Sequence, residues 1–169
     1  MTGSSSPGIA LMGESISHCG SAEIPMVIVN SQRAGPSTGM PTKIEQGDLG
    51  MMISGGNGDF PRIVLSPGDA SECFEIGALA TNLAQIAQCP VFIALDRALS
   101  QDSMTVPVFD LDSVEMNTGK MLSATEVAEL DEYKRYSVTE DGISPWAVPG
   151  TPGGMSLVTG NERNEWGQV

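Results

Sequence analysis

Three short runs of apolar residues divide the first part of the chain. They read PMVIVNS at 25–31, RIVLS at 62–66 and PVFIALD at 90–96. Each run is continuous rather than alternating and is rich in β-branched side chains, which is typical of strands buried on both faces of a sheet. We therefore predict three strands.

Apolar positions outside these runs follow a helical period. A first helix is predicted over 9–20, because its apolar residues are separated by three, four and three positions and share one face. A second helix follows Asp69, which caps it while Glu72 reaches back as in a capping box. A short helix is expected at 49–52. The shared face of the first helix consists of Ile9, Met12, Ile16 and Cys19.

The final third of the chain has a different pattern. It contains one predicted helix, 124–133, introduced by Ser123, and an acidic stretch within it is expected to face solvent. The segment GISPWAVPGTPGG at 142–154 is rich in Gly and Pro. Because so long a loop-rich stretch is unusual in a self-contained domain, we expect it to pack on the same domain or on a partner.

Alternating strands and helices indicate an α/β fold, a parallel sheet with flanking helices and right-handed crossovers. We assign residues 1–97 to a partial parallel α/β domain and 98–169 to a loop-rich C-terminal extension. Three strands make a small sheet, and the chain opens immediately before a helix. We therefore expect the chain to be a piece of a larger assembly.

The charge of the chain excludes several classes of partner. Eight Lys and Arg stand against 21 Asp and Glu, which gives a formal net charge of −13. Such a chain repels phosphate backbones and anionic lipid, so we expect no nucleic acid and no membrane as partner. No apolar stretch approaches the roughly 20 residues that span a bilayer, and the N-terminus lacks the pattern of a secretory signal.

Three cysteines are widely spread and form no C-x-x-C pair. Cys19, Cys73 and Cys89 therefore predict neither a disulfide framework nor a zinc or iron–sulfur site held by this chain alone. We interpret them as small core residues. A reducing, cytoplasmic setting fits this composition best.

Two motifs suggest chemistry but have simpler interpretations. GSSSPG at 3–8 resembles the start of a phosphate loop, yet Ile9 and Ala10 stand where Lys and Ser or Thr belong, so we favour a strand-to-helix turn over an anion site at a helix N-terminus. His18 lies beside Cys19 and between acidic residues, but we favour an ordinary helix position over a metal site. A single histidine also disfavours Ser-His-Asp and Cys-His hydrolases.

The most informative segment is the polar loop QRAGPSTGMPTKIEQGDL at 32–49. It leaves the carboxyl end of a predicted parallel strand, where open α/β sheets bind their ligands. The planar guanidinium of Arg33 suits a carboxylate, and the hydroxyl of Thr42 suits a carbonyl oxygen. On composition alone, a ligand loop and a generic connector are equally favoured.

At this segment the sequence resembles a known family, the alpha subunits of 2-oxoacid:ferredoxin oxidoreductases. These are thiamine diphosphate enzymes that include pyruvate and 2-oxoglutarate synthases. The string QR-x-GPSTG-x-PTK-x-EQGDL is long and specific, and it lies within a longer matching block. Matching blocks run from one end of the chain to the other: Ser5–Glu14, Ala22–Leu49, Pro61–Gly68, Glu140–Gly154 and, more loosely, Asn161–Gly167.

The resemblance implies a fold, a reaction and a site. The fold is the domain that faces the aminopyrimidine ring of thiamine diphosphate. The reaction is oxidative decarboxylation of a 2-oxoacid with coenzyme A, with electrons passing to ferredoxin. Arg33 binds the substrate carboxylate, Thr42 lies near the 2-oxo group, and Ser37 and Thr38 join the candidate substrate-binding set. Other matched loop residues, such as Lys43, Glu45, Gln46 and Asp48, equally suit shaping of the loop.

The resemblance also implies partners. Thiamine diphosphate, magnesium and an iron–sulfur cluster are expected in the assembled complex, with a beta subunit that carries thiamine diphosphate and the cluster, and none is expected on this chain alone. The family's upstream half-domain and its C-terminal domain are expected to lie outside this chain, and Arg163 stands where the family usually has His. Two hypotheses follow: a site-bearing piece of the alpha subunit, inactive when isolated, or a catalytically silent assembly module of the same fold.

Overall fold

A computed structural model describes all residues of the chain, 1–169. Its main sheet has four strands: β1 (Thr2–Ser4), β2 (Met26–Gln32), β3 (Ile63–Leu65) and β4 (Pro90–Asp96). They are ordered β1-β2-β4-β3 and every pairing is parallel. The predicted parallel α/β sheet is confirmed, but the prediction of three strands is wrong.

Strand β1 is the one that the apolar pattern misses. Its residues are polar or small, and it pairs with β2 in a register that sets Thr2 opposite Ile28. Backbone pairing at an edge needs no apolar side chains, so the pattern carries no signal. The segment 3–8 is the favoured strand-to-helix turn, and a Cβ at Gly8 would lie 2.0 Å from the Ser4 hydroxyl oxygen.

The predicted first helix is two helices, α1 (Ser6–Leu11) and α2 (Gly13–Ala22). At Met12 the backbone leaves the α-helical region, and its N–H bonds the Ile9 carbonyl at 3.0 Å, which tightens the last turn. The following Gly13 weakens helix propensity at the same point. The chain therefore turns there without losing the shared apolar face of Ile9 and Ile16.

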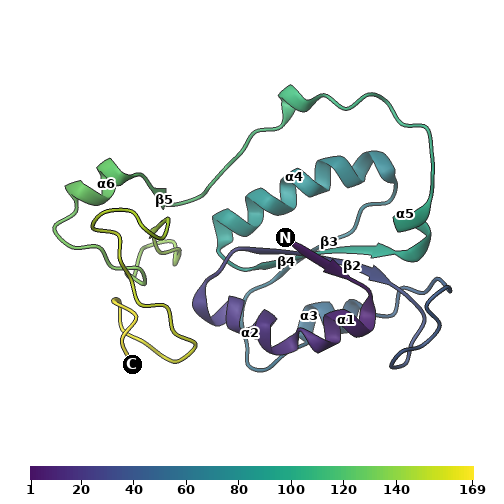
Figure 1. Cartoon of the computed structure of the whole chain (residues 1–169), viewed down its shortest axis with the longest axis horizontal. Coiled ribbons are helices and arrows are strands. Elements are labelled where there is room, and N and C mark those ends of the chain that lie inside the picture. Colours follow the sequence, from purple (N-terminus) through teal and green to yellow (C-terminus); the bar gives the residue numbers. More distant parts are fainter.

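Helices cover both faces of the sheet (Figure 1). On one face lie α1, α2 and α3 (Leu49–Ser54); on the other lies α4 (Ala70–Ala87). Because successive side chains of a strand alternate between faces, β2 supplies Ile28 to one core cluster and Val27 to the other. Asp69 caps α4 as predicted, but Glu72 reaches the N–H of Gly68 at 2.6 Å rather than that of Asp69.

Beyond α5 (Arg97–Gln101), an extended connector runs back along α4 (Figure 1). Phe109 stacks on Phe74 with ring centroids 4.5 Å apart. Further along, Asn82 donates to the Glu115 carbonyl at 2.7 Å and accepts from the Asn117 N–H at 2.9 Å. The connector thus returns the chain to the amino end of the sheet.

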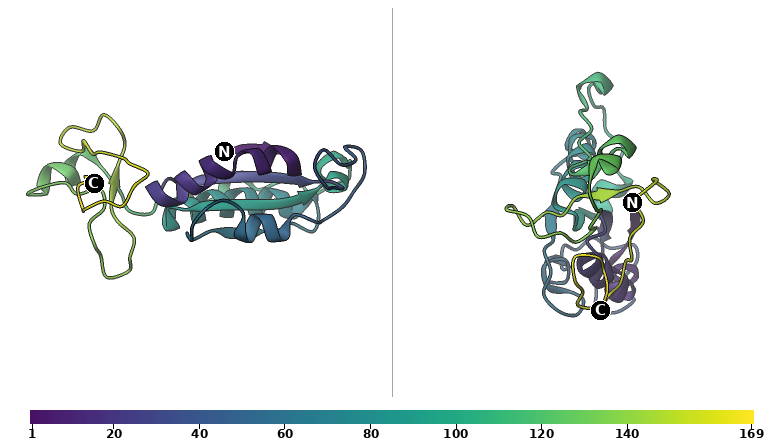
Figure 2. Two further views of the ribbon diagram at one scale, coloured as in Figure 1. Left: turned by 90° about the horizontal axis from the view of Figure 1, so that it is seen from below. Right: turned by 90° about the vertical axis from the view of Figure 1, so that its left-hand side faces the viewer.

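The remaining residues form a small module at that end (Figure 2). A two-stranded parallel sheet joins β5 (Met121–Leu122) to β6 (Trp146–Ala147), and α6 (Ala124–Glu129) begins with a complete capping box at Ser123. The prediction of a helix to 133 is too long. After Glu129 the chain extends, and the Tyr133 hydroxyl accepts a hydrogen bond from the Ala147 N–H at 3.0 Å.

A buried arginine, Arg135, and a half-buried one, Arg163, attach this module to the end of α2. Arg135 donates to the Glu23 carboxylate at 3.1 Å and to the Glu23 carbonyl at 2.8 Å, while Arg163 donates to the Ser21 carbonyl. Both cations lie at a helix C-terminus, where the helix dipole favours positive charge. Arg163 also lies 3.8 Å over the Tyr136 ring, and burial raises the pKa of Tyr136 although both arginines oppose that shift. Arg163 is thus a packing residue here.

None of the helices combines the length and the apolar character needed to cross a membrane. Cys19 and Cys89 are buried, as predicted for core residues, and Cys73 is half-buried. The acidic residues of α6 and of the stretch after it are exposed, as predicted.

Candidate functional site

The carboxyl ends of the parallel strands meet at the edge of the sheet farthest from the C-terminal module (Figure 1). Strands β1, β2 and β4 end there at Ser4, Gln32 and Asp96. The ligand loop was predicted at 32–49; in the structure Gln32 ends β2 and Leu49 begins α3, so the loop comprises residues 33–48 and leaves β2 at this edge. Ligands of open α/β sheets bind at such an edge, so the loop is the first place to examine.

Arg33 is half-buried at the root of the loop. Its backbone N–H donates to the Ser6 hydroxyl at 3.1 Å, which ties it to the start of α1. Its side chain donates to the Thr38 carbonyl at 2.9 Å, and its Nε–H is buried without a hydrogen-bond partner. None of the four ion pairs of the chain includes Arg33. The guanidinium therefore keeps donors that no carboxylate of this chain neutralises.

The other candidate substrate-binding residues are exposed on the same loop. Ser37 has a φ of +56°, in the left-handed region. The next residue, Thr38, accepts a hydrogen bond from the Arg33 side chain through its carbonyl. The Ala34 N–H donates to the Lys43 carbonyl at 3.3 Å, so the residue after Thr42 returns beside the root of the loop. No hydrogen bond joins Ser37 or Thr42 to Arg33. The structure thus brings Thr38 and Arg33 into contact and leaves the hydroxyl of Thr42 free.

Two carboxylates brace the middle of the loop. Glu45 accepts from the Gly35 N–H at 3.3 Å, and Gln46 donates to Asp96 at 2.8 Å. The N–H of Leu99 and the side chain of Gln46 both donate to Asp96, which lowers its pKa below the ordinary value. The loop is therefore fixed to the end of β4 as well as to β2.

Asp48 fixes the far end of the loop to β2. Its carboxylate accepts from the Asn30 amide at 3.1 Å, and its N–H donates to the Gln32 amide oxygen at 2.9 Å. Sequence reasoning named neither Asn30 nor Gln32, nor the contact of Ser6 with Arg33. A signal was present: Asn30 and Gln32 stand two positions apart in the strand, which places both amides on one face of the sheet.

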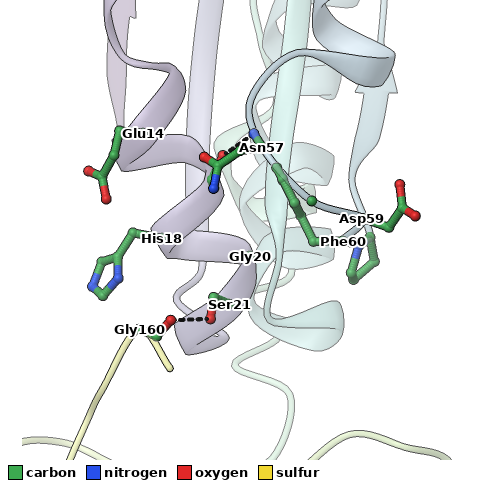
Figure 3. A pocket seen from close by; sticks show the side chains of 11 residues that line it. Glu14, His18, Gly20, Ser21, Asn57, Asp59, Phe60 and Gly160 are labelled. Carbon is green, nitrogen blue, oxygen red and sulfur yellow. Dashed lines mark hydrogen bonds between the residues drawn. The ribbon is translucent and has the colours of Figure 1, made fainter. Parts of the chain in front are cut away.

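A polar hollow of about 410 Å³ lies elsewhere, between α2, the turn before β3 and Gly160 (Figure 3). Glu14 and His18 line one side, and Asp59 lies on the other. The Ser21 hydroxyl donates to the Gly160 carbonyl at 3.3 Å and closes its floor. His18 is exposed, in keeping with an ordinary helix position.

The side chains of this chain do not fit a metal ion or an iron–sulfur cluster. No group of three or more His, Cys, Asp or Glu residues lies close enough together to hold a metal. Burial raises the pKa of the Cys19 and Cys89 thiols, which opposes the thiolate form that metals require. We therefore assign no residue of this chain to such a group.

Comparison with known proteins identifies the family of the chain. Residues 1–149 match the family model described as "Pyruvate flavodoxin/ferredoxin oxidoreductase, thiamine diP-bdg". The alpha subunit of 2-oxoacid:ferredoxin oxidoreductase from Saccharolobus solfataricus is 41% identical over 170 residues, which cover 99% of this chain and 26% of that protein. The 2-oxoglutarate synthase subunit KorA of Methanothermobacter thermautotrophicus is 34% identical over 170 residues, or 99% of this chain and 43% of that protein.

A solved structure agrees in three dimensions. The 2-oxoglutarate:ferredoxin oxidoreductase of Magnetococcus marinus, with 2-oxoglutarate, coenzyme A and succinyl-CoA bound, matches with a TM-score of 0.91 and 41% identity. The match covers 99% of this chain and 28% of that one, so the chain spans about a quarter of the length of several of these relatives. The chain belongs to the family of thiamine diphosphate-binding domains of pyruvate flavodoxin/ferredoxin oxidoreductases.

Proposed function

We propose that this chain is the substrate-carboxylate-binding part of the alpha subunit of a 2-oxoacid:ferredoxin oxidoreductase. The complete enzyme converts a 2-oxoacid and coenzyme A into acyl-CoA and carbon dioxide, and ferredoxin accepts the electrons. The observation that carries the proposal is Arg33, a cation without a carboxylate partner in a chain of net charge −13, at the carboxyl edge of a parallel sheet. The bound 2-oxoglutarate of the Magnetococcus relative supports it.

The geometry of the loop suits a 2-oxoacid. The donors of the Arg33 guanidinium are suited to a carboxylate, which they bind in a planar, two-pronged contact. Under this proposal the hydroxyl of Thr42 donates to the neighbouring 2-oxo oxygen, and Ser37 and Thr38 join the substrate-binding set; all three residues are exposed on the loop. Holding both ends of the 2-oxoacid unit fixes the orientation of the bond that breaks, which removes part of the entropic barrier.

Other components supply the remaining chemistry under this proposal. Thiamine diphosphate, when bound, supplies the nucleophile that adds to the 2-oxo carbon. We assign magnesium, the iron–sulfur cluster and the diphosphate site to a beta subunit and to further parts of the alpha subunit, because no three His, Cys, Asp or Glu residues of this chain lie together. Three unpaired thiols support a cytoplasmic location.

The test replaces Arg33 in the complete enzyme. Arg33→Ala should lower kcat/KM for 2-oxoacid-dependent ferredoxin reduction roughly 30-fold or more, because a charge-assisted contact to the substrate is lost. This factor corresponds to a loss of about 2–5 kcal/mol of transition-state stabilisation. Arg33→Lys keeps the charge but not the planar fork, so its kcat/KM should lie between those of wild type and Arg33→Ala. Arg97→Ala is the matched control, since Arg97 is another half-buried cation without an ion pair near this edge. Both pyruvate and 2-oxoglutarate are assayed.

A catalytically silent assembly module is the second candidate. It is favoured by the contact between the Arg33 side chain and the Thr38 carbonyl, which gives the guanidinium a structural partner within the loop. Under this alternative Arg33→Ala leaves ferredoxin reduction unchanged in the assembled complex. The same measurement therefore separates the two functions.

A further inference from the structure

A buried amide breaks the apolar pattern of the central strand next to the ligand loop. Asn30 in β2 has no exposed surface, and it lies on the same face of the sheet as Ile28 and Gln32. Next to Asn30 on that face, Ile28 is apolar and packs against α1, α2 and α3 through Ile9, Ile16 and Met52. An apolar side chain of similar size fits such a position at lower cost.

The amide is only half-satisfied. Its Nδ2 donates to the Asp48 carboxylate at 3.1 Å, but its Oδ1 is buried without a hydrogen-bond partner. A buried polar atom left unpaired is destabilising, and the cost falls on the folded state. Local rules are broken in this way chiefly where a residue serves a site rather than the fold.

The partner of Asn30 is the last residue of the ligand loop. Asp48 is half-buried and is held twice by β2, through Asn30 and through the Gln32 amide oxygen at 2.9 Å. The Asp48 carbonyl then accepts from the N–H of Met52, a fully buried residue of α3. Loss of the Asn30 contact therefore leaves the Asp48 carboxylate without its hydrogen-bond partner, and only backbone contacts then hold this end of the loop.

The two ends of the loop are fixed to different elements, the first to the start of α1 and the last to β2. At one end the Arg33 N–H bonds Ser6, and at the other Asp48 bonds Asn30, while the residues between are almost all exposed. We infer that Asn30 is a positioning residue: through Asp48 it holds loop 33–48 in the shape that presents Arg33 to the substrate carboxylate. This inference rests on the proposed function for its kinetic consequence, but not for its effect on the loop.

The experiment compares Asn30→Leu with wild type in the complete enzyme. Leucine has a similar size and removes the unpaired oxygen, so the melting temperature should stay the same or rise. The KM for the 2-oxoacid should rise about tenfold while kcat changes less than about twofold, because substrate binding and not the chemical step loses its support. Hydrogen exchange of the amides in 33–48 should accelerate, with no change in 90–96.

Two further variants make the result specific. Asp48→Asn retains an oxygen for the Asn30 amide and a backbone N–H for Gln32, so it should keep the wild-type KM. Gln88→Met is the matched control, because Gln88 is also a buried amide with an unpaired oxygen, donates to the Ser144 carbonyl at 2.5 Å and lies at the opposite end of the sheet. It should leave the KM unchanged.

The outcomes separate this inference from the proposed function. An unchanged KM for Asn30→Leu, in an enzyme whose KM responds to Arg33→Lys, overturns the inference. So does a lower melting temperature with an unchanged KM, which assigns Asn30 to folding alone. If Arg33 variants have no effect, the proposed function fails instead, and the exchange rates of 33–48 then decide whether Asn30 holds the loop.

Discussion

The two ends of the parallel sheet use their positive charges differently. All four ion pairs of the chain draw their cations from the C-terminal module: Lys120, Lys134, Arg135 and Arg163. The cations of the sheet and its loops pair with no carboxylate: Arg33, Lys43, Arg62 and Arg97. In a chain with an excess of acidic residues this division is informative. Ion pairs at the amino end stabilise the fold, whereas Arg33, Lys43 and Arg97 lie at the carboxyl end and remain available to an anion. Arg62 lies at the amino end, just before β3, and donates to the Gly55 carbonyl instead of to a carboxylate.

Burial follows the same division. At the amino end Arg135 is buried and binds both the carboxylate and the carbonyl of Glu23. At the carboxyl end Arg33 is half-buried and its protein partner is one backbone carbonyl. A buried charge needs a partner to offset its lost hydration, whereas a half-hydrated one tolerates unfilled donors. The comparison predicts that one arginine affects stability and the other activity.

The largest expected effect is on stability at the amino end. Arg135→Ala should lower the free energy of unfolding by about 2–3 kcal/mol, because it leaves the partly buried Glu23 carboxylate without its closest cation. Urea denaturation measures the change. Arg33→Ala is the matched control and should cost less than about 1 kcal/mol. Equal losses of unfolding free energy in the two variants would contradict the idea that the arginines at the two ends of the sheet have different roles.

A smaller effect is expected in the connector that joins the two ends. Phe109→Ala should cost about 1 kcal/mol, since it removes one ring of the stacked pair with Phe74 while Phe109 is only 40% exposed. Val108→Ala is the matched control, because Val108 is 98% exposed and should change stability by less than about 0.5 kcal/mol. Equal stability of the Phe109 variant and wild type would show that the connector is not held against α4.

The smallest effect is an acid sensitivity confined to the C-terminal module. The Lys120 ammonium, the Ile143 N–H and the Thr139 hydroxyl hold the pKa of Asp141 at about 2, below its ordinary value of 3.8. A depressed folded-state pKa contributes stability above the unfolded value, and this stability is lost as pH falls from about 4 through about 2. The two tryptophans, Trp146 and Trp166, both lie in this module, so intrinsic fluorescence reports its loosening.

The control for the acid sensitivity is Asp141→Asn. This variant cannot titrate at that position, so its fluorescence should depend less on pH between 4 and 2 than that of wild type. An acid transition identical in the two proteins would remove Asp141 as its source.

The apolar strands were predictable because burial on both faces imposes a continuous apolar run. Strands β2, β3 and β4 lie within a residue or two of the predicted runs. Strand β1 was missed because it pairs through its backbone and its side chains carry no pattern. The break at Met12 was also missed, since the apolar face continues through it. Ser123 was predicted as the cap of the last helix, because a helix cap depends on a few neighbouring residues; the structure adds the reciprocal contact from Glu126.

The site was predictable only in part. The loop and Arg33 were indicated by composition and by the resemblance, and Gln46 and Asp48 were expected to shape the loop. Their partners were not predictable, because Asp96 lies 50 residues from Gln46 and Asn30 lies 18 residues from Asp48. Polar contacts between distant segments have no period or spacing in the sequence. Only the folded sheet brings such groups to one edge.

The sequence by itself determined a parallel α/β layer, its buried strands and the polar loop that follows the first of the apolar ones, because these depend on local burial patterns. The tertiary structure decided which charged side chains form ion pairs within the chain and which remain unpaired. Glu23 and Arg135 are 112 residues apart, and only chain return along α4 places them in contact. Arg33 stays without a carboxylate partner because no acidic side chain of this chain folds back within reach of it.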